Sequence, residues 1–253
     1  MAEPLSPLGG QVAVVTGGGS GIGRAIAVSL ARRGVRCVLA GRRASMLSET
    51  LAMLDVPGTS VVADVTDAGD RRSIVDHVLH SLGRIDLLVH AAGVFEKRPV
   101  DQTDDEFWNR ITDVNVAAVM ALSRSAWPAL SATSGQIVLI SSIAATEAFE
   151  GDAAYAASKG ALEALGRVLA LEGRPHGIRV ITVAPGQTDT AIWGDEAPPE
   201  VRARMMPASG VGELIASLVA ADRRIAMSPL AIRPTNDPWS VEDHGPAAPD
   251  PRS

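Results

Sequence analysis

The sequence predicts an α/β protein built on a Rossmann-type, doubly wound parallel sheet of seven strands with helices on both faces. Short apolar runs alternate with helical segments along the chain, which is the pattern of a parallel sheet covered on both sides. A glycine-rich turn at residues 16–23 joins the first apolar run to the first helical segment, an arrangement typical of doubly wound sheets. With 253 residues, 46% of them hydrophobic, the chain can close one large core.

Each element is expected from its own run of residues, taken in chain order. Strands are expected at residues 12–16, 35–40, 59–63, 85–89, 135–141, 178–184 and 230–233. Helices are expected at residues 21–33, 44–54, 67–82, 103–130, 152–172 and 211–221. Right-handed crossovers place a switch point beside the first strand, and ligands of such sheets bind outside the carboxyl ends of the strands. A single domain over residues 8–235 results.

Two segments fall outside this alternation. Residues 187–207 are rich in Pro, Gly and charge and contain Trp193, so they suit either a mobile lid over a site or an ordinary surface connection. Residues 236–253 hold four prolines, several acids and little apolar content, which predicts a disordered or loosely docked tail.

The composition limits the expected partners. The formal net charge is −6 and arginines do not gather into a stripe, so neither nucleic acid nor an anionic membrane is expected to bind. Cys37 is the only cysteine, so no internal disulfide can form, and the N-terminus lacks the basic and apolar regions of a signal peptide. No metal site is expected. We expect a cytoplasmic protein that binds a small molecule.

The turn Thr16-Gly17-Gly18-Gly19-Ser20-Gly21-Ile22-Gly23 predicts a phosphate-binding site. Its spacing is not G-x-G-x-x-G, but the physical need is the same, because backbone must approach a pyrophosphate and the first helical N–H groups must face it. A flexible linker is the alternative, but linkers are not bounded by a buried strand and an amphipathic helix. The expected cofactor contacts are Gly17, Gly19, Ser20, Gly21, Ile22 and Gly23.

Arg42 and Arg43 lie about twenty residues after Gly21, where an acid would bind a ribose 2′-hydroxyl. No carboxylate occurs between Cys37 and Ser48. An arginine at this position suits a 2′-phosphate, which favours NADP(H) over NAD(H). The alternative is two solvated arginines at a helix start.

Tyr155 is the only tyrosine of the chain and stands four residues before Lys159, one of only two lysines. In a helix, residues i and i+4 share a face, and an ammonium beside a phenol favours the phenolate. A phenol whose pKa falls from about 10 toward neutrality is a usable general acid or base. The alternative for the pair alone is a buried tyrosine with a snorkelling lysine.

Two further polar residues stand at informative places. Ser142 lies thirteen residues before Tyr155, at the carboxyl end of an expected strand. Asn115 lies inside the long fourth helix, where asparagine is unfavourable unless its side chain or a local break of the helix has a purpose.

With these residues in place, the chain resembles the short-chain dehydrogenase/reductase family in its compact single-domain branch, over roughly residues 10–233. The resemblance rests on a T-G-x-x-x-G-x-G turn, an Asp after the third strand, the residues Asn115, Ser142, Tyr155 and Lys159 at the family's spacing, and a Pro-Gly turn. Any one of these motifs alone would be weak, and their combination is specific.

The resemblance implies a role for each position. Tyr155 would exchange a proton with the substrate oxygen, and Lys159 would lower the pKa of Tyr155 and bind the nicotinamide ribose. Ser142 would hydrogen-bond the substrate oxygen, and Asn115 would hold a water that relays protons from Lys159. The remaining cofactor contacts would be Asp64 and Val65 at the adenine, Ala91, Ala92 and Gly93 in the central turn, and Pro185, Gly186, Thr188 and Thr190 at the nicotinamide.

Three departures from the family pattern concern its periphery. His90 and Ala91 replace the usual paired asparagines, so His90 is interpreted as structural, and Thr188 replaces a Val or Ile. The ending Ile232-Arg233-Pro234-Thr235 resembles that of reductases acting on small or secondary-metabolite carbonyls. Substrate selectivity is expected at Thr146, Glu147, Phe149, Gln187 and Trp193, because loops carry such variation.

The leading interpretation is an NADP-preferring oxidoreductase that interconverts a carbonyl and a secondary alcohol. The alternatives are a catalytically silent nucleotide-binding regulatory or scaffold protein on the same fold, and a sugar-nucleotide epimerase, which would need a second lobe. The resemblance also implies a homodimer or homotetramer formed through the two long helices. Small residues of the second, from Ala153 to Gly166, would let these helices approach closely.

Overall fold

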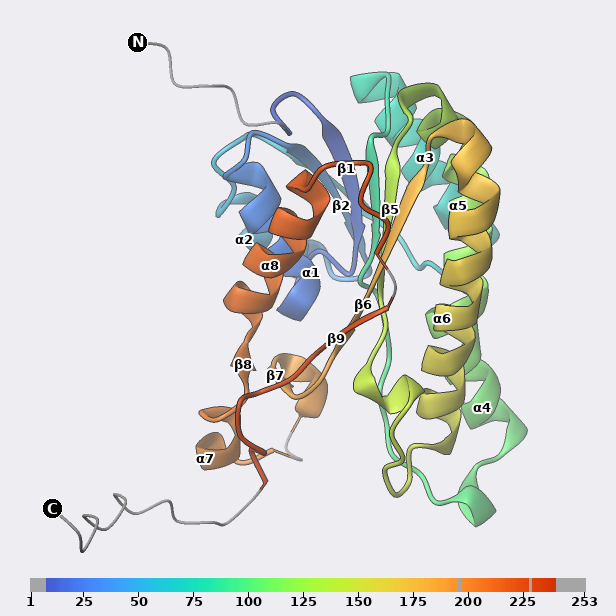
Figure 1. Cartoon of the computed structure of the whole chain (residues 1–253), viewed down its shortest axis with the longest axis vertical. Coiled ribbons are helices and arrows are strands. Elements are labelled where there is room, and N and C mark those ends of the chain that lie inside the picture. The colour runs from blue at the N-terminus through green and yellow to red at the C-terminus, as the bar shows by residue number, and fades with distance from the viewer. Residues whose placement is uncertain (1–7, 195–196, 228, 240–253) are drawn as a thin grey trace, which may run out of the picture.

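The computed structural model describes residues 8–194, 197–227 and 229–239, and its centre is a seven-stranded sheet (Figure 1). The strand order is β3-β2-β1-β4-β5-β6-β9, and all neighbouring strands pair in parallel. The strands are β1 Val12–Thr16, β2 Arg36–Gly41, β3 Thr59–Val62, β4 Leu87–His90, β5 Gln136–Ile140, β6 Arg179–Pro185 and β9 Leu230–Ile232. The predicted α/β fold with seven parallel strands is confirmed.

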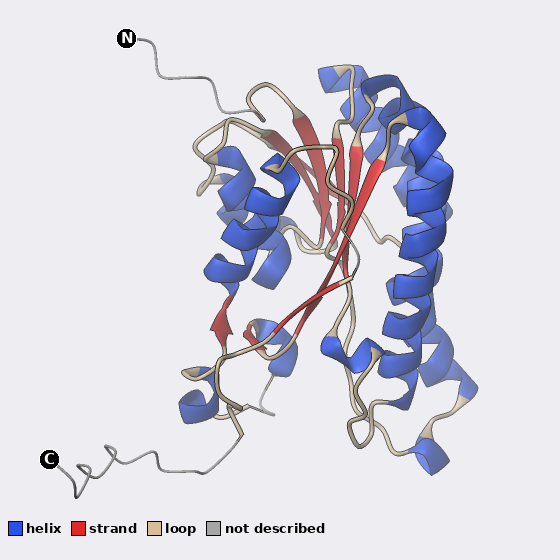
Figure 2. Ribbon diagram, viewed as in Figure 1, coloured by secondary structure: helices blue, strands red, loops and turns tan. Residues whose placement is uncertain are grey.

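Helices cover both faces of the sheet (Figures 1 and 2). One layer holds α1 Gly21–Ala31, α2 Ala44–Leu51 and α8 Ala208–Ala220, and the other holds α3 Ala68–Leu82, α5 Ala118–Thr133 and α6 Ala153–Gly173. Each layer buries its own apolar cluster against the sheet, with Leu30 and Ile215 in the first and Ile74 and Leu162 in the second. Successive strand residues alternate between the two clusters, which is why the strands read as continuous apolar runs.

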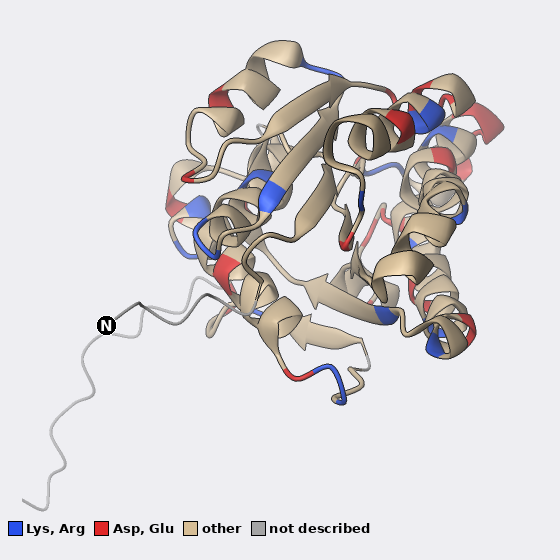
Figure 3. Ribbon diagram, turned by 90° about the horizontal axis from the view of Figure 1, so that it is seen from above, with Lys and Arg blue, Asp and Glu red and all other residues tan. Residues whose placement is uncertain are grey.

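Charged residues lie mainly on the helices and the turns between them, and the strands carry few of them (Figure 3). Acidic and basic residues intermingle in this view. None of the described helices is both long enough and apolar enough to cross a lipid bilayer.

The fourth predicted helix, residues 103–130, is not continuous. After a short 3₁₀ turn at Val100–Gln102, this region divides into α4 Asp105–Thr112, a π turn at Asp113–Ala117, and α5. The Asp104 carboxylate caps α4 by accepting from the backbone N–H of Phe107 at 2.8 Å, which fixes where the helix begins. The π turn contains Asn115, whose position in a continuous helix would be unfavourable.

Residues 187–207 contain regular structure of their own. β7 Thr188–Asp189 pairs in parallel with β8 Met206–Pro207, and between them lie a 3₁₀ turn at Ala191–Trp193 and the short helix α7 Pro199–Arg202. Trp193 packs there against Ala197, Val201 and Met205. The segment is therefore anchored at both ends beside the sheet.

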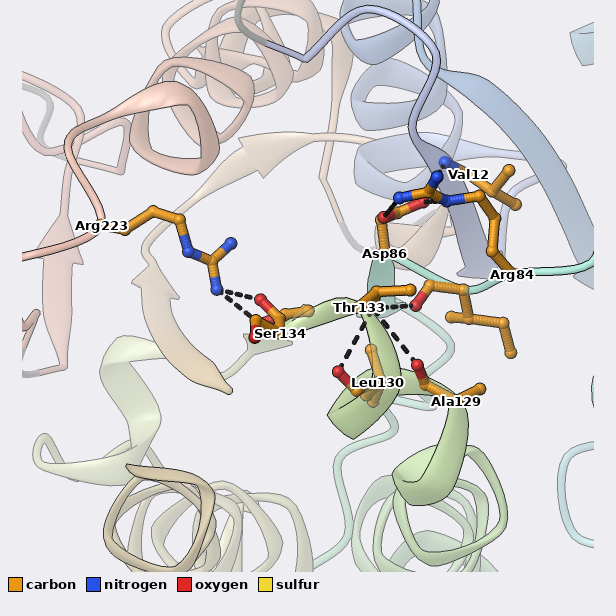
Figure 4. A network of polar contacts seen from close by, with 10 residues as sticks. Val12, Arg84, Asp86, Ala129, Leu130, Thr133, Ser134 and Arg223 are labelled. Carbon is orange, nitrogen blue, oxygen red and sulfur yellow. Dashed lines mark hydrogen bonds and ion pairs between the residues drawn. The ribbon is translucent and has the colours of Figure 1, made fainter. Parts of the chain in front are cut away.

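The amino-terminal edge of the sheet is closed by a polar network (Figure 4). Asp86 accepts from the backbone N–H of Val12 at 2.9 Å and from Arg84 at 2.6 Å. Thr133 donates to the carbonyl of Ile85 at 2.7 Å, and Arg223 donates to the carbonyls of Ser134, Gly135 and Gly177. Groups that the strands and helices leave without a backbone partner are thus satisfied by side chains.

Arg179 completes this edge from the first position of β6. Its guanidinium donates to Gln136 Oε1 at 2.6 Å and to the carbonyls of Leu218, Val219, Ala221 and Asp222 at 2.8–3.1 Å. The side chain is buried, and these acceptors join β5 and β6 to the end of α8.

Candidate active site

A cavity of about 610 Å³ opens at the carboxyl edge of the sheet. Its walls come from the glycine turn after β1, the segments after β2, β3, β4, β5 and β6, helix α6, and the C-terminal Trp239. Because every strand is parallel, all of these segments meet at one edge, as the strand pattern predicts. Every predicted site residue except Asn115 lines this cavity.

The glycine turn has no room for side chains. Gly17 has a φ of +66°, and a Cβ there would lie 2.8 Å from Ala91 O; a Cβ on Gly23 would lie 2.4 Å from Gly17 O. Arg24 holds the turn from behind, donating to Gly19 O at 2.7 Å. Helix α1 begins within this turn at Gly21, so the free backbone N–H groups of its first turn face the cavity.

Arg42 and Arg43 stand exposed at the end of β2, on the cavity wall next to the glycine turn. Arg43 lies 3.4 Å from Ser20 Oγ through its Nη2. Hydrogen bonding from Thr66 lowers the pKa of Asp64, and the Arg42 charge adds to the effect. The two guanidiniums, the Ser20 hydroxyl and the helix N-terminus together form a cationic corner that suits a phosphate.

The Tyr155 phenol lies at the opposite end of the cavity from this corner, against Ser142. Burial raises the pKa of Tyr155 to about 12, a hydrogen bond with the Ser142 side chain opposes the rise, and the Asp152 charge adds to it. The phenol is therefore protonated at neutral pH and can donate a proton.

This pKa moves in the direction opposite to the one expected from the Tyr155–Lys159 spacing. Lys159 Nζ does lie near the phenol, 5.5 Å from its ring centroid, and donates to Ile140 O at 2.9 Å. Burial lowers the pKa of Lys159 itself to about 8. Desolvation of the phenol sets the direction of this shift, and the group that opposes it is the Ser142 side chain.

Asn115 sits behind the cavity wall instead of lining it. Its Oδ1 accepts from the backbone N–H of Val94 at 2.9 Å, and its Nδ2 donates to Val94 O and Ser158 Oγ, both at 3.0 Å. A Cβ on Gly93 would lie 3.4 Å from Asn115 Oδ1 and 3.8 Å from Lys159 Nζ. The π turn thus lets a helix side chain hold the segment after β4 beside Lys159.

His90 is buried away from the cavity, as its structural interpretation expects. Its Nε2 lies 2.9 Å from Ser123 Oγ on α5, and burial lowers its pKa to about 3. The imidazole is therefore neutral and links β4 to α5. Thr188 lines the cavity and donates its hydroxyl to Gly186 O at 3.0 Å, so it stabilises the Pro-Gly turn.

The positions expected to govern selectivity are found in part. Phe149, Gln187 and Trp193 line the cavity, whereas Thr146 and Glu147 do not. Phe95 and Trp239 also line it and were missed. Trp239 belongs to the tail expected to be disordered or loosely docked, of which residues 240–253 lie outside the described residues. The presence of Trp239 in an otherwise polar segment was the one sequence feature that could have indicated its place at the cavity.

Comparison with known proteins agrees with this geometry. Residues 11–200 match the family model for short chain dehydrogenase. The chain is 34% identical over 247 residues to the glycine betaine reductase ATRR of Emericella nidulans. The match covers 93% of this chain but only 19% of the length of ATRR. It is 33% identical over 195 residues to the hydroxynaphthalene reductase arp2 of Aspergillus fumigatus, covering 76% of this chain and 71% of arp2.

Among solved structures, an alcohol dehydrogenase from the archaeon Thermococcus sibiricus, complexed with 5-hydroxy-NADP, has a TM-score of 0.82 to this chain. The two are 24% identical, and the match covers 89% of this chain and 97% of the other. At that identity the likeness establishes a common fold.

Proposed function

The chain belongs to the short-chain dehydrogenase family and is an oxidoreductase, and on that premise we propose that it is NADP-preferring and interconverts a carbonyl and a secondary alcohol. The observation that carries the proposal is the convergence of Ser142, Tyr155 and Lys159 in the same cavity as the glycine turn and Arg42. A proton donor and a phosphate corner at opposite ends of one cavity suit a dinucleotide whose reactive ring lies beside the donor.

The residues present fit a nicotinamide dinucleotide. Gly17 and Gly23 leave room for a pyrophosphate against the turn, and Asp64 and Val65 border the place for an adenine. At the other end, Pro185, Gly186, Thr188 and Thr190 would border the nicotinamide, and Lys159 its ribose. A nicotinamide held there would supply the hydride transfer to a carbonyl carbon or from an alcohol carbon.

The protein's own residues would move the proton and hold the substrate. In reduction, Tyr155 donates its phenolic proton to the carbonyl oxygen, while Ser142 hydrogen-bonds the same oxygen. Lys159, with its pKa lowered to about 8, returns a proton toward the phenol through a water held by Asn115. The high pKa of Tyr155 favours the donor role, and two relatives named as reductases agree with reduction.

The preference for NADP(H) is supported by the charges at the carboxyl end of β2. Arg42 and Arg43 line the cavity there, and the nearest carboxylate on that wall, Asp64, is hydrogen-bonded to Thr66 Oγ1 at 2.7 Å. A 2′-phosphate would gain charge-assisted hydrogen bonds from the guanidiniums, whereas a 2′-hydroxyl would gain less.

The test is cofactor oxidation measured by absorbance, with NADPH and NADH each offered against a panel of ketones, aldehydes and imines. Carbonyl reduction with NADPH preferred is the expected result. Cofactor binding without turnover of any carbonyl in either direction would favour the catalytically silent alternative.

We also propose self-association through α5 and α6. On α6 an exposed stripe runs Ala157, Ala161, Ala164, Val168 and Leu171, and Leu171 is 62% exposed. Gly166 serves the monomer instead, because a Cβ there would lie 2.7 Å from Thr182 Oγ1. Small residues at helical spacing allow two helices to pack closely across a two-fold axis. Sedimentation should give a dimer or tetramer; a particle of one chain's mass at micromolar concentration would refute it.

A further inference from the structure

Aromatic side chains gather at the cavity. The sequence contains eight of them: four Trp, three Phe and one Tyr. Five line the cavity, namely Phe95, Phe149, Tyr155, Trp193 and Trp239. In a chain with 3% aromatic residues, so strong a concentration around one cavity calls for a ligand that aromatic rings bind well.

Four of these rings form a row that begins at the proposed proton donor. The centroid of Phe95 lies 4.9 Å from that of Tyr155 and 5.5 Å from that of Trp193, with interplanar angles of 72° and 67°. Trp193 and Trp239 come next at 6.3 Å and 59°. The four rings come from α6, the segment after β4, the segment between β7 and α7, and the C-terminal segment.

Trp193 is held firmly in this row. Its indole N–H donates to Thr188 O at 2.9 Å, and its ring packs against Ala197, Val201 and Met205. Because its orientation is fixed on both sides, a ligand that contacts its ring does not have to order it first.

Trp239 reaches the cavity because β9 is parallel to β6. Its carboxyl end, like all the others, lies at the site edge, and Gly186 N–H donates to Ile232 O at 2.7 Å. Arg233 Nε then donates to Glu147 Oε1 at 3.1 Å, and the backbone N–H of Trp239 donates to Asp237 Oδ1 at 3.0 Å. The segment after β9 therefore brings Trp239 to the cavity wall, where the side chain keeps 44% of its surface exposed.

We infer that this row is a substrate subsite for planar aromatic carbonyl compounds, such as aryl and fused-ring ketones. The reacting carbonyl reaches Tyr155 and Ser142, while the ring system of the substrate lies against Phe95, Trp193 and Trp239. Aromatic pairs stabilise one another beyond the burial of their area, and the half-exposed indole of Trp239 gains most from being covered. The inference rests on the proposed carbonyl chemistry and adds its substrate class.

The first test compares kcat/KM for three ketones: α-tetralone, which is fused to an aromatic ring, decalone, which is saturated and of similar size, and cyclohexanone. The wild type should prefer α-tetralone to cyclohexanone by about tenfold or more, and to decalone by a smaller factor. Trp239→Ala should lower both preferences by roughly threefold to tenfold, and Trp239→Phe should keep most of them.

Trp108→Ala is the matched control. Trp108 is 41% exposed, close to the 44% of Trp239, but lies on α4 and does not line the cavity. Its replacement should leave the ratios of kcat/KM unchanged. Equal ratios in wild type and Trp239→Ala, or equal use of α-tetralone and decalone by the wild type, would overturn the aromatic subsite.

A binding measurement separates this inference from the proposed chemistry. Naphthol has a fused aromatic ring and no ketone, so calorimetry can measure its binding without turnover. Wild type and Trp108→Ala should bind it equally, and Trp239→Ala more weakly. Naphthol binding without reduction of any ketone would reject the proposed chemistry and keep the subsite. Reduction of aliphatic ketones without naphthol binding would reject the subsite and keep the proposed chemistry.

Discussion

Two buried cations lie at opposite edges of the same sheet, and their surroundings differ sharply. Arg179, at the amino edge, donates to one side-chain oxygen and four backbone carbonyls. Lys159, at the carboxyl edge, donates to Ile140 O, and within the described part of the chain no carboxylate lies at ion-pair distance from it. Arg179 is saturated with hydrogen bonds, whereas Lys159 has few of them.

The difference separates stability from function on a single scaffold. Burial lowers the pKa of both side chains, but the hydrogen-bonded guanidinium of Arg179 stays charged and rigidifies its surroundings, whereas the Lys159 ammonium, with a pKa of about 8, can exchange its proton. The strands themselves do not distinguish the two edges, because each strand is a continuous apolar run from one edge to the other. The two edges differ in the side chains at the strand ends. Single substitutions at these ends test that contrast, beginning with the largest expected effect.

Tyr155→Phe should abolish most turnover while leaving the fold intact. The variant keeps the ring and its contact with Phe95 but loses the transferable proton, so kcat should fall by roughly 10²–10⁴. Cofactor titration should show little change in affinity, which is the control for a folded site. Near-normal turnover of an identified substrate would exclude Tyr155 as the proton donor.

Arg179→Met should produce the largest loss of stability at the amino edge. It leaves Gln136 Oε1 and Ala221 O without this donor and removes one of the donors to the carbonyls of Leu218, Val219 and Asp222, so the free energy of unfolding should fall by about 3–5 kcal/mol in denaturant titration. Arg224→Met is the control, because that side chain is 90% exposed and pairs only with Asp222, so no measurable change is expected. Equal stability of the two variants would break the contrast between the edges.

Arg42→Ala should weaken NADP(H) binding by about 1.5–3 kcal/mol, through loss of charge-assisted contacts to the 2′-phosphate, and leave NAD(H) nearly unchanged. Arg36→Ala makes a matched control, since Arg36 is exposed at the amino end of the same strand β2. Calorimetric titration of both cofactors measures the effect. Equal weakening for both cofactors, or a wild-type preference for NAD(H), would contradict the assignment.

Lys159→Met should stabilise the protein while inactivating it, the opposite of Arg179→Met. Burial lowers the Lys159 pKa from 10.5 to about 8, so the folded state disfavours the ammonium and wild type carries this cost in full below pH 8. The variant should gain about 1–3 kcal/mol at pH 7, after loss of the bond to Ile140 O.

The pH profile of that gain is the decisive measurement. The folded chain loses the Lys159 proton near pH 8 and the unfolded chain near pH 10.5. The stability advantage of the variant should therefore shrink as pH rises from 8 to 10.5. A gain that is independent of pH, or a loss of stability at pH 7, would show that the Lys159 ammonium is well accommodated.

The strands and the positions that meet at the cavity could be predicted from sequence because they depend on local pattern. Val12–Thr16 reads as a buried strand by itself, and the glycine turn after it has few other uses. Parallel strands then bring Ser142, Gly186 and Arg42 to one edge without further information. The same logic would have placed the end of β9 at the cavity edge.

The features that could not be predicted depend on tertiary surroundings. The pKa of Tyr155 is set by burial, which a spacing of four residues does not report. The boundaries of α4 depend on the Asp104 cap and on the π turn, neither of which interrupts the hydrophobic pattern. Docking of residues 236–239 depends on contacts with Trp193, which is far away in sequence.

The π turn also sets the rotational phase of two helices. Phe107, Ile111, Asn115 and Val119 are all buried, at intervals of four residues. At about 100° per residue, twelve α-helical steps from Phe107 to Val119 would leave these side chains about 120° apart. The extra residue, marked by Ala118 N–H donating to Asp113 O, brings them back to within about 20°. A one-residue deletion here would give a regular helix whose two halves stay in phase, and it would remove only the widened turn from which Asn115 reaches Val94.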